Sequence, residues 1–219
     1  MPEVYLIFIK VYIMSNLKDK IKSNPILKKR VLNLMVHPVK TRPRLWLRLL
    51  LRFYSRRGSE SVIYRSVRKD IVPFNRFELG EKSVIEDYSI VNNMVGDIII
   101  GRESRIGLGN VVIGPVTIGD DVIIAQGVVM SGLDHNFNRT DISISKQGVS
   151  TELINIGNNV WIGANAVITK GVKIGDNSVI AACSLVNRDV PPFSVVAGSP
   201  ASVIKRFNHE TKEWERVKS

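Results

Sequence analysis

Residues 157–184 read GNNVWIGANAVITKGVKIGDNSVIAACS and carry an isoleucine at every sixth position, namely Ile162, Ile168, Ile174 and Ile180. A spacing of six is neither the 3.6-residue period of a helix nor the two-residue period of a strand. The residue four positions after each isoleucine is small or β-branched in most cases. On an extended segment that residue points to the same side as the next isoleucine. Each hexad is therefore predicted to be a very short strand with two inward side chains.

The same spacing recurs in three runs. They are Leu79, Ile85 and Val91; then Ile100, Ile106, Val112, Ile118, Ile124 and Met130; then Ile156, Ile162, Ile168, Ile174, Ile180 and Val186. The second inward positions expected from this phase are Ser83, Ser89, Val95, Ser104, Asn110, Val116, Val122, Val128, Val160, Ala166, Val172, Ser178, Ser184 and Val190. Short strands that alternate with corners and stack in parallel form a solenoid. Three hexads per turn predict a triangular prism with about 18 residues per coil.

Glycine often follows the aliphatic residue, as at Gly101, Gly107, Gly119, Gly157, Gly163 and Gly175, and Asn or Asp sometimes comes next. We expect these residues at the corners because they tolerate sharp bends and positive φ.

Two breaks interrupt the phase. A three-residue slip separates Val91 from Ile100, and the 26-residue interval from Met130 to Ile156 is not a multiple of six. Residues 131–155 are therefore predicted to leave the prism as a loop. Long loops on a regular scaffold often carry function.

The formal charge of +11 is unevenly spread. Residues 1–78 carry 18 Lys and Arg against 5 Asp and Glu, whereas residues 79–219 carry 13 against 15. We expect three parts: a basic, partly helical segment over 1–78, the mainly β prism over 79–204, and a short helix in the tail over 205–219. The segments 24–39 and 42–57 look helical, with apolar and basic residues interleaved.

The basic segment has two interpretations. It is either an interfacial amphipathic segment on an anionic membrane, with Trp46, Phe53 and Tyr54 inserted, or a helical cap or clasp between subunits. No nucleic-acid-binding motif accompanies it, so nucleic acid is not an expected partner.

Cys183 is the one cysteine, which rules out an intrachain disulfide and favours a cytoplasmic location, with peripheral attachment to the inner face of the membrane as an option. No stretch reaches the roughly 18 to 20 apolar residues of a spanning helix. The apolar opening VYLIFIKVYIM is interrupted by Lys10 and lacks a cleavage pattern, so no signal peptide is expected. Met14 is an alternative start to Met1.

The chain resembles the hexapeptide-repeat acyltransferases, whose fold is a trimeric left-handed parallel β-helix. The matching segments are VTIGDDVIIAQGVVMSG (116–132), residues 156–207 with the ending DVPPFSVVAGSPA (189–201), and the histidine-bearing loop between them. Within the family the chain is most similar to sugar and polysaccharide O-acetyltransferases of the maltose and galactoside type, and to xenobiotic acetyltransferases. The resemblance implies acetyl-CoA as acyl donor, a sugar or glycan acceptor, and an active site between the subunits of a homotrimer.

The resemblance also implies roles for residues. His135, in SGLDHNF, matches the family's general base, and a loop imidazole can take a proton from a sugar hydroxyl near neutral pH. The expected contacts to acetyl-CoA are Trp161, Gly163, Ala164, Ala182, Asn187, Lys205 and Arg206, the last two for its phosphates. Ala181-Ala182-Cys183 stands where the family often has Gly-Ala-Gly.

Asn110 and Asp134 are expected to bind the acceptor, although Asn110 also occupies an inward hexad position. Cys183 is expected to be an inert small hydrophobe rather than an acyl-carrying nucleophile.

Other functions remain open or are excluded. A serine acetyltransferase, a xenobiotic acetyltransferase and a catalytically silent trimeric sugar-binding scaffold are alternatives. A γ-class carbonic anhydrase needs three His ligands for zinc, but the prism region offers only His135, so no metal is expected. The 78 residues before the prism lack the Gly-rich loop of a nucleotide-sugar pyrophosphorylase.

Overall fold

The computed structural model describes residues 23–217, apart from the side chains of Pro25, Lys28 and Lys29. The stretch containing Met1, Lys10 and Met14, and with it the prediction about the start, lies outside the described residues. The chain divides into two compact units, residues 1–50 and residues 51–219.

In the described part of the first unit, residues 23–50, the chain is partly helical, as the sequence predicts. Helix α2 (Pro25–Met35) begins after Asn24, whose side chain accepts hydrogen bonds from the backbone N–H groups of Ile26 and Leu27 at 3.1 and 3.0 Å. This cap satisfies two of the free N–H groups at a helix start. Helix α3 (Leu45–Leu49) follows a turn in which the Nδ1 atom of His37 accepts hydrogen bonds from two backbone N–H groups.

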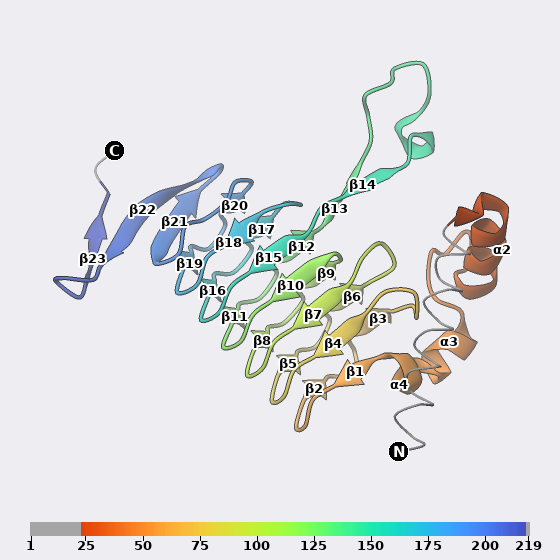
Figure 1. The fold of residues 1–219 in the computed structure, drawn as a ribbon, viewed down its shortest axis with the longest axis horizontal. Helices are drawn as coiled ribbons and strands as arrows, with labels where there is room; N and C mark the ends of the chain where they lie inside the picture. Colours follow the sequence, from red (N-terminus) through yellow and green to blue (C-terminus); the bar gives the residue numbers. More distant parts are fainter. Residues whose placement is uncertain (1–22, 218–219) are drawn as a thin grey trace. The chain divides into compact units, whose positions relative to one another are not determined.

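The second unit opens with α4 (Leu51–Tyr54) and is then a solenoid of three parallel sheets, drawn in Figure 1. The first sheet comprises β1 (Arg56–Arg57), β4 (Phe77–Leu79), β7 (Ile98–Ile100), β10 (Val116–Ile118), β15 (Ile154–Ile156) and β18 (Lys173–Ile174). The second comprises β2 (Val62–Ile63), β5 (Val84–Ile85), β8 (Arg105–Ile106), β11 (Ile123–Ile124), β16 (Trp161–Ile162), β19 (Val179–Ile180) and β21 (Ser194–Gly198). The third comprises β3 (Arg68–Asp70), β6 (Ile90–Asn92), β9 (Val111–Ile113), β12 (Val129–Ser131), β17 (Val167–Ile168) and β20 (Leu185–Val186). The predicted prism is confirmed.

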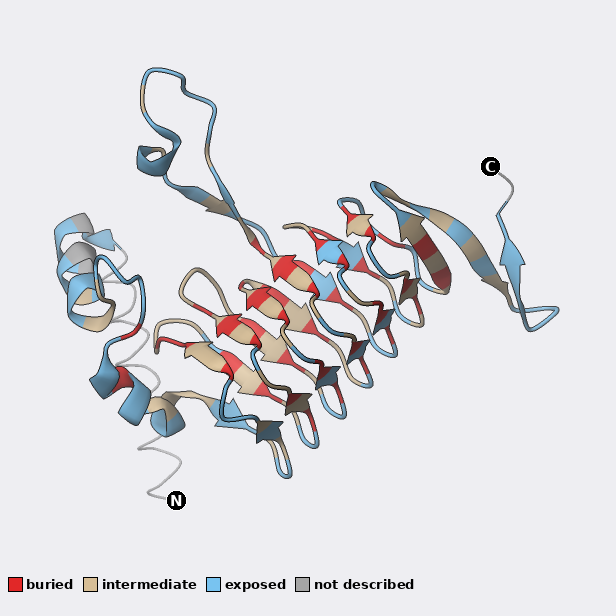
Figure 2. Cartoon of the chain, turned by 180° about the vertical axis from the view of Figure 1, so that it is seen from behind, coloured by how far each residue is buried: buried red, intermediate tan, exposed pale blue. Residues whose placement is uncertain are grey.

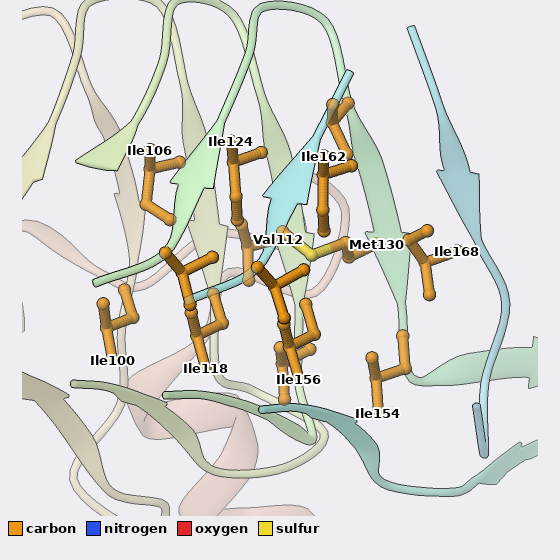
Figure 3. Close-up of a cluster of buried hydrophobic side chains, with 14 of the residues drawn as sticks. Ile100, Ile106, Val112, Ile118, Ile124, Met130, Ile154, Ile156, Ile162 and Ile168 are labelled. Carbon is orange, nitrogen blue, oxygen red and sulfur yellow. The ribbon is translucent and has the colours of Figure 1, made fainter. Parts of the chain in front are cut away.

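The aliphatic residues of the hexads form its core. All fifteen members of the three runs are at most 2% exposed. Equivalent positions stack in register, so that Ile106, Ile124 and Ile162 lie one above another along the second sheet (Figure 3). Burying such a side chain contributes about 1.5–3 kcal/mol, and the whole column is shielded from water by the three sheets (Figure 2).

Several polar side chains at the second inward position connect successive coils. Ser104 is 1% exposed, and its hydroxyl donates to the carbonyl of Gly119 at 2.8 Å and accepts from the N–H of Val122 at 3.0 Å. The hydroxyl thus satisfies corner backbone groups that have no strand partner. Val95 is an exception, because it falls in the slip and is half-buried. Asn93 and Ile98 are the buried residues there.

The corner glycines are needed for close approach and not for positive φ, which corrects the expectation from sequence. A Cβ on Gly119 would lie 2.6 Å from the carbonyl oxygen of Gly157, and one on Gly163 would lie 2.5 Å from the backbone nitrogen of Ala182. The left-handed conformation falls further along the corner, as at Asn159, with a φ of 51°.

Two predicted boundaries are wrong. The solenoid begins at Arg56 and not at residue 79. The prediction missed the first coil because its strands carry charged residues where the later hexads have aliphatic ones. The tail predicted as a helix over 205–219 is not helical in its described part, residues 205–217. Strand β22 (Ala201–Asn208) pairs antiparallel with β21 and with β23 (Glu213–Arg216). Half-buried and exposed residues alternate along most of β22, which is the two-residue period of a strand.

Candidate functional site

The interval that breaks the hexad phase forms a hairpin that stands out from the prism (Figure 1). Its strands are β13 (Leu133–His135) and β14 (Val149–Thr151), paired antiparallel with His135 opposite Val149. A 3-10 helix over Ile144–Lys146 lies near its tip. The hairpin leaves after β12 in the third sheet and returns at β15 in the first. The loop predicted over 131–155 is thus a hairpin over 132–153, because Ser131 still belongs to β12 and Ile154 already belongs to β15.

The tip of this hairpin is ordered by one glutamine. The Nε2 atom of Gln147 donates to the carbonyl oxygens of Arg139 and Ile142 at 2.7 and 3.1 Å, and its Oε1 atom accepts from the N–H of Arg139 at 3.0 Å. Asn136 donates to the carbonyl of Gln147 at 3.2 Å. The projection is therefore held by its own hydrogen bonds.

Lys170 joins the root of the hairpin to the prism. Its Nζ atom donates to the hydroxyl of Ser150 at 2.7 Å and lies 3.3 Å from Oδ2 of Asp134. These partners belong to opposite strands of the hairpin, whereas Lys170 follows β17. Asp134, expected to bind a substrate hydroxyl, is thus engaged with the protein, although its side chain is 55% exposed.

We expect Lys170→Met to loosen the hairpin while leaving the prism unchanged. The substitution keeps the aliphatic stem and removes the ammonium that contacts both strands. Because exposed ion pairs are worth little individually, amide exchange over 133–151 should accelerate by roughly three- to tenfold. Hydrogen–deuterium exchange measures this directly. Lys173→Met is the matched control, since Lys173 is exposed on β18. Equal exchange in the two variants would show that Lys170 does not hold the hairpin.

His135 is the last residue of β13 and is exposed. Within residues 23–217, no protein group is hydrogen-bonded to its imidazole. The backbone of His135 is paired with Val149 of β14, and Lys170 contacts Asp134, the residue before it. An exposed imidazole without a protein partner can act as a general base toward a bound molecule.

Trp161 lies elsewhere, on the outer face of the second sheet, and is 52% exposed. It lines a groove of about 310 Å³ together with Ile123 and Val179 of the neighbouring strands. Phe193, Phe207 and Trp214 also line this groove. The sequence analysis did not identify these three aromatic residues. Phe207 and Trp214 were expected in a helix instead of the β22–β23 hairpin.

The corner after β16 brings three of the predicted residues together. Gly163 and Ala164 stack on Ala182 of the next coil, and the N–H of Cys183 donates to the carbonyl of Ala164 at 2.8 Å. Cys183, expected to be an inert small hydrophobe, is exposed at this corner and has a φ of 58°.

The remaining predicted residues are spread over other elements. Asn187 follows β20 and is exposed. Lys205 and Arg206 lie on β22, opposite Val195 and Ser194 of β21.

Asn110 is not available to a ligand, which corrects its predicted role. It is fully buried, its Nδ2 atom donates to the carbonyls of Gly107 and Ala125 at 2.8 and 2.9 Å, and its Oδ1 atom accepts from the N–H of Val128 at 2.6 Å. The alternative structural role noted for this inward position is the one that the structure supports.

In the part of the chain that the structure describes, no group of three or more His, Cys, Asp or Glu side chains is placed to hold a metal ion. The chemistry available is that of an imidazole, a short run of corner N–H groups and an aromatic groove. The imidazole lies on a hairpin between the third and first sheets, and the groove lies on the second sheet.

Comparison with known proteins identifies the repeats. Residues 154–188 match the family model "Bacterial transferase hexapeptide (six repeats)", and residues 97–131 match "Hexapeptide repeat of succinyl-transferase". Galactoside O-acetyltransferase of Escherichia coli is 47% identical over 100 residues, which are 45% of this chain and 48% of that protein. A putative lipopolysaccharide biosynthesis O-acetyl transferase of the same organism is 37% identical over 109 residues, 47% of this chain and 56% of that protein.

Among solved structures, AntD, an N-acyltransferase from Bacillus cereus in complex with dTDP and 3-hydroxybutyryl-CoA, superposes with a TM-score of 0.62 at 20% identity. The match covers 75% of this chain and 89% of that one. This likeness shows the fold, the left-handed parallel β-helix. The chain spans about half the length of the curated relatives it matches.

Proposed function

We propose that this hexapeptide-repeat chain, which resembles the hexapeptide-repeat acyltransferases, transfers an acetyl group from acetyl-CoA to a hydroxyl of a sugar or polysaccharide precursor. The observation that carries the proposal is the exposed imidazole of His135 on an anchored hairpin, at the one long interruption of such a solenoid. The names of the two Escherichia coli relatives, both O-acetyl transferases, support the substrate class.

His135 acts as general base in this mechanism. Its ring nitrogen takes the proton of the acceptor hydroxyl while the oxygen attacks the thioester carbonyl of acetyl-CoA. A C–O bond forms, the tetrahedral intermediate collapses, and the C–S bond breaks to release the CoA thiolate, which recovers a proton. The transfer is direct, so Cys183 carries no acyl group.

The corner at Gly163–Ala164 supplies polar backbone groups near the acyl donor. Trp161 and Ala182 flank the pantetheine arm, Asn187 lies further along it, and Lys205 and Arg206 meet the phosphates. Backbone N–H groups that are aimed at a developing oxyanion are worth most in a site shielded from water. Asp134 contacts the acceptor through the carboxylate oxygen that Lys170 leaves free.

A homotrimer completes the site in this proposal. Within one chain the His135 hairpin and the Trp161 groove belong to different sheets. A cyclic arrangement of three prisms would place the hairpin of one copy beside the donor groove of the next. The flat sheet faces, with exposed Ile123 and Val167, offer apolar surface for such packing.

The test is an acetyl-transfer assay with acetyl-CoA and a panel of acceptors. The panel contains sugars, nucleotide sugars, serine and chloramphenicol, and free thiol release is followed against the rate without acceptor. We expect stimulation by at least one sugar or nucleotide sugar, with an acetyl ester in the product by mass spectrometry. Stimulation by serine or chloramphenicol alone would instead favour a serine or xenobiotic acetyltransferase. Acceptor binding without any thiol release would favour a silent scaffold.

No helix among residues 23–217 has the length and apolar character needed to cross a bilayer. A cytoplasmic location, with attachment to a membrane surface through the basic segment, remains a prediction of the sequence.

A further inference from the structure

The first unit exposes an unusual amount of apolar surface. Ile26, Leu34, Val39, Leu45 and Leu49 are 69, 65, 84, 68 and 72% exposed. Large apolar side chains of this kind are individually common on surfaces, but here five occur within 24 residues. Leu47, in the middle of α3, is only 2% exposed, so this short helix has one inward and one outward apolar side.

The described part of this unit is basic. Seven Lys and Arg and no Asp or Glu lie in residues 23–50. At α3 they stand four residues apart, at Arg44 and Arg48, each directly before an apolar residue. The guanidinium of Arg44 donates to the carbonyl of Asn33 at 3.0 and 3.1 Å, a contact that leaves its charge uncompensated.

We propose that residues 23–50 form a docking surface for an anionic lipid bilayer, here called the basic apolar surface. Leu45, Leu49 and Trp46 enter the interface between headgroups and acyl chains, and the arginines around them contact lipid phosphates. Interleaved apolar and cationic side chains are the pattern of segments that lie in the membrane surface. Each cation near an anionic leaflet adds to the attraction.

Charge decides between a membrane and a second copy of this surface. Two such surfaces in a symmetric contact would bring cations against cations, because a twofold interface uses the same patch twice. A bilayer with acidic headgroups supplies the opposite charge and an apolar phase together. Nucleic acid would supply the charge but would leave the five exposed aliphatic side chains in water. This inference does not depend on the proposed acetyl transfer.

Vesicle flotation with the full chain tests the proposal. Phosphatidylcholine vesicles with and without phosphatidylglycerol are compared at low salt and at about 1 M salt, where the screening length is ~3 Å. We expect the chain to float with the vesicles that contain phosphatidylglycerol, and to lose roughly tenfold in partitioning both without that lipid and at high salt.

Two double variants separate the contributions. Leu45→Ser with Leu49→Ser removes exposed apolar groups, and Arg44→Gln with Arg48→Gln removes two charges. Each is expected to lower partitioning by roughly tenfold. Tyr88→Ser is the control, because Tyr88 is 73% exposed on the prism, next to an acidic residue. Light scattering of every variant in solution reports its mass.

The outcomes are distinct. A wild-type chain that ignores the anionic lipid overturns the proposal. A Leu45→Ser, Leu49→Ser variant that floats like wild type also overturns it. If the mass of that variant in solution is smaller than the wild-type mass, the basic apolar surface is an interface between copies of the chain. Loss of flotation in both double variants at unchanged mass, with Tyr88→Ser unaffected, supports it.

Discussion

Replacing His135 by Ala is expected to lower kcat/KM for acetyl transfer by about 10²–10⁴-fold, the contribution typical of a general base. A sugar hydroxyl is a weak nucleophile until its proton is removed, and the exposed imidazole at the end of β13 is the group proposed to remove it. His135 lies on the hairpin between the third and first sheets, whereas the Trp161 groove lies on the second sheet. The loss of His135 should therefore leave the affinity for CoA within a few-fold of wild type. The measurements are steady-state thiol release and CoA binding by calorimetry.

The control for this variant is His37→Ala, which removes an imidazole that accepts hydrogen bonds within the turn before α3. It should retain wild-type kcat/KM. His135→Ala with wild-type activity would remove the mechanism, and a loss of CoA affinity equal to the loss in kcat/KM would show that the ring binds the donor instead of activating the acceptor.

The prism could be predicted from the sequence because one local rule repeats along it. Each hexad places its aliphatic residue inward, and equivalent isoleucines pair in register from coil to coil, as Ile124 does with Ile106 and Ile162. A solenoid needs little more information than this, since each coil contacts only its neighbours. The same rule predicted the hairpin, because the interval from Met130 to Ile156 is not a multiple of six.

The parts of the fold that were predicted wrongly depend on contacts between residues far apart in the sequence. The β22–β23 hairpin contains Lys, Arg and Glu that suit a helix, but β21 offers an edge on which β22 adds as a strand. The first coil was hidden because its strands carry Arg56, Arg57 and Arg68, whose charges break the hexad signal. The aromatic groove is a product of both the prism and the tail, so no local pattern marks it.

Lys170 is a residue of the candidate site that local sequence patterns could not identify. Nothing near it in sequence connects it to Asp134, which lies 36 positions earlier, and the contact exists only because the hairpin folds back beside the coil that follows. The sequence alone indicated that His135 lies on the interruption, whereas the contact between Lys170 and the residue before it required the three-dimensional arrangement.

Asn110→Ala is expected to destabilise the fold by about 2–4 kcal/mol without changing the KM for the acceptor. The substitution leaves the carbonyl of Ala125 and the N–H of Val128 without partners in a site closed to water, while the carbonyl of Gly107 keeps the hydrogen bond from the hydroxyl of Ser89 at 2.9 Å. Each buried group left unsatisfied costs about 1–3 kcal/mol, and relaxation recovers part of the total. Thermal unfolding, followed by circular dichroism at one protein concentration because oligomers shift with concentration, should show a fall of several degrees.

The matched control is Asn155→Ala, since Asn155 is exposed on the outer face of β15 and should change stability by no more than about 0.5 kcal/mol. The two candidate roles of Asn110 predict opposite results. A residue that binds the sugar would raise the acceptor KM and leave the unfolding temperature in place. A residue that joins two successive coil corners lowers the unfolding temperature and leaves the kinetics of the surviving folded enzyme unchanged. Because the whole amide is already satisfied inside the prism, the second result is the one that the hydrogen bonds require.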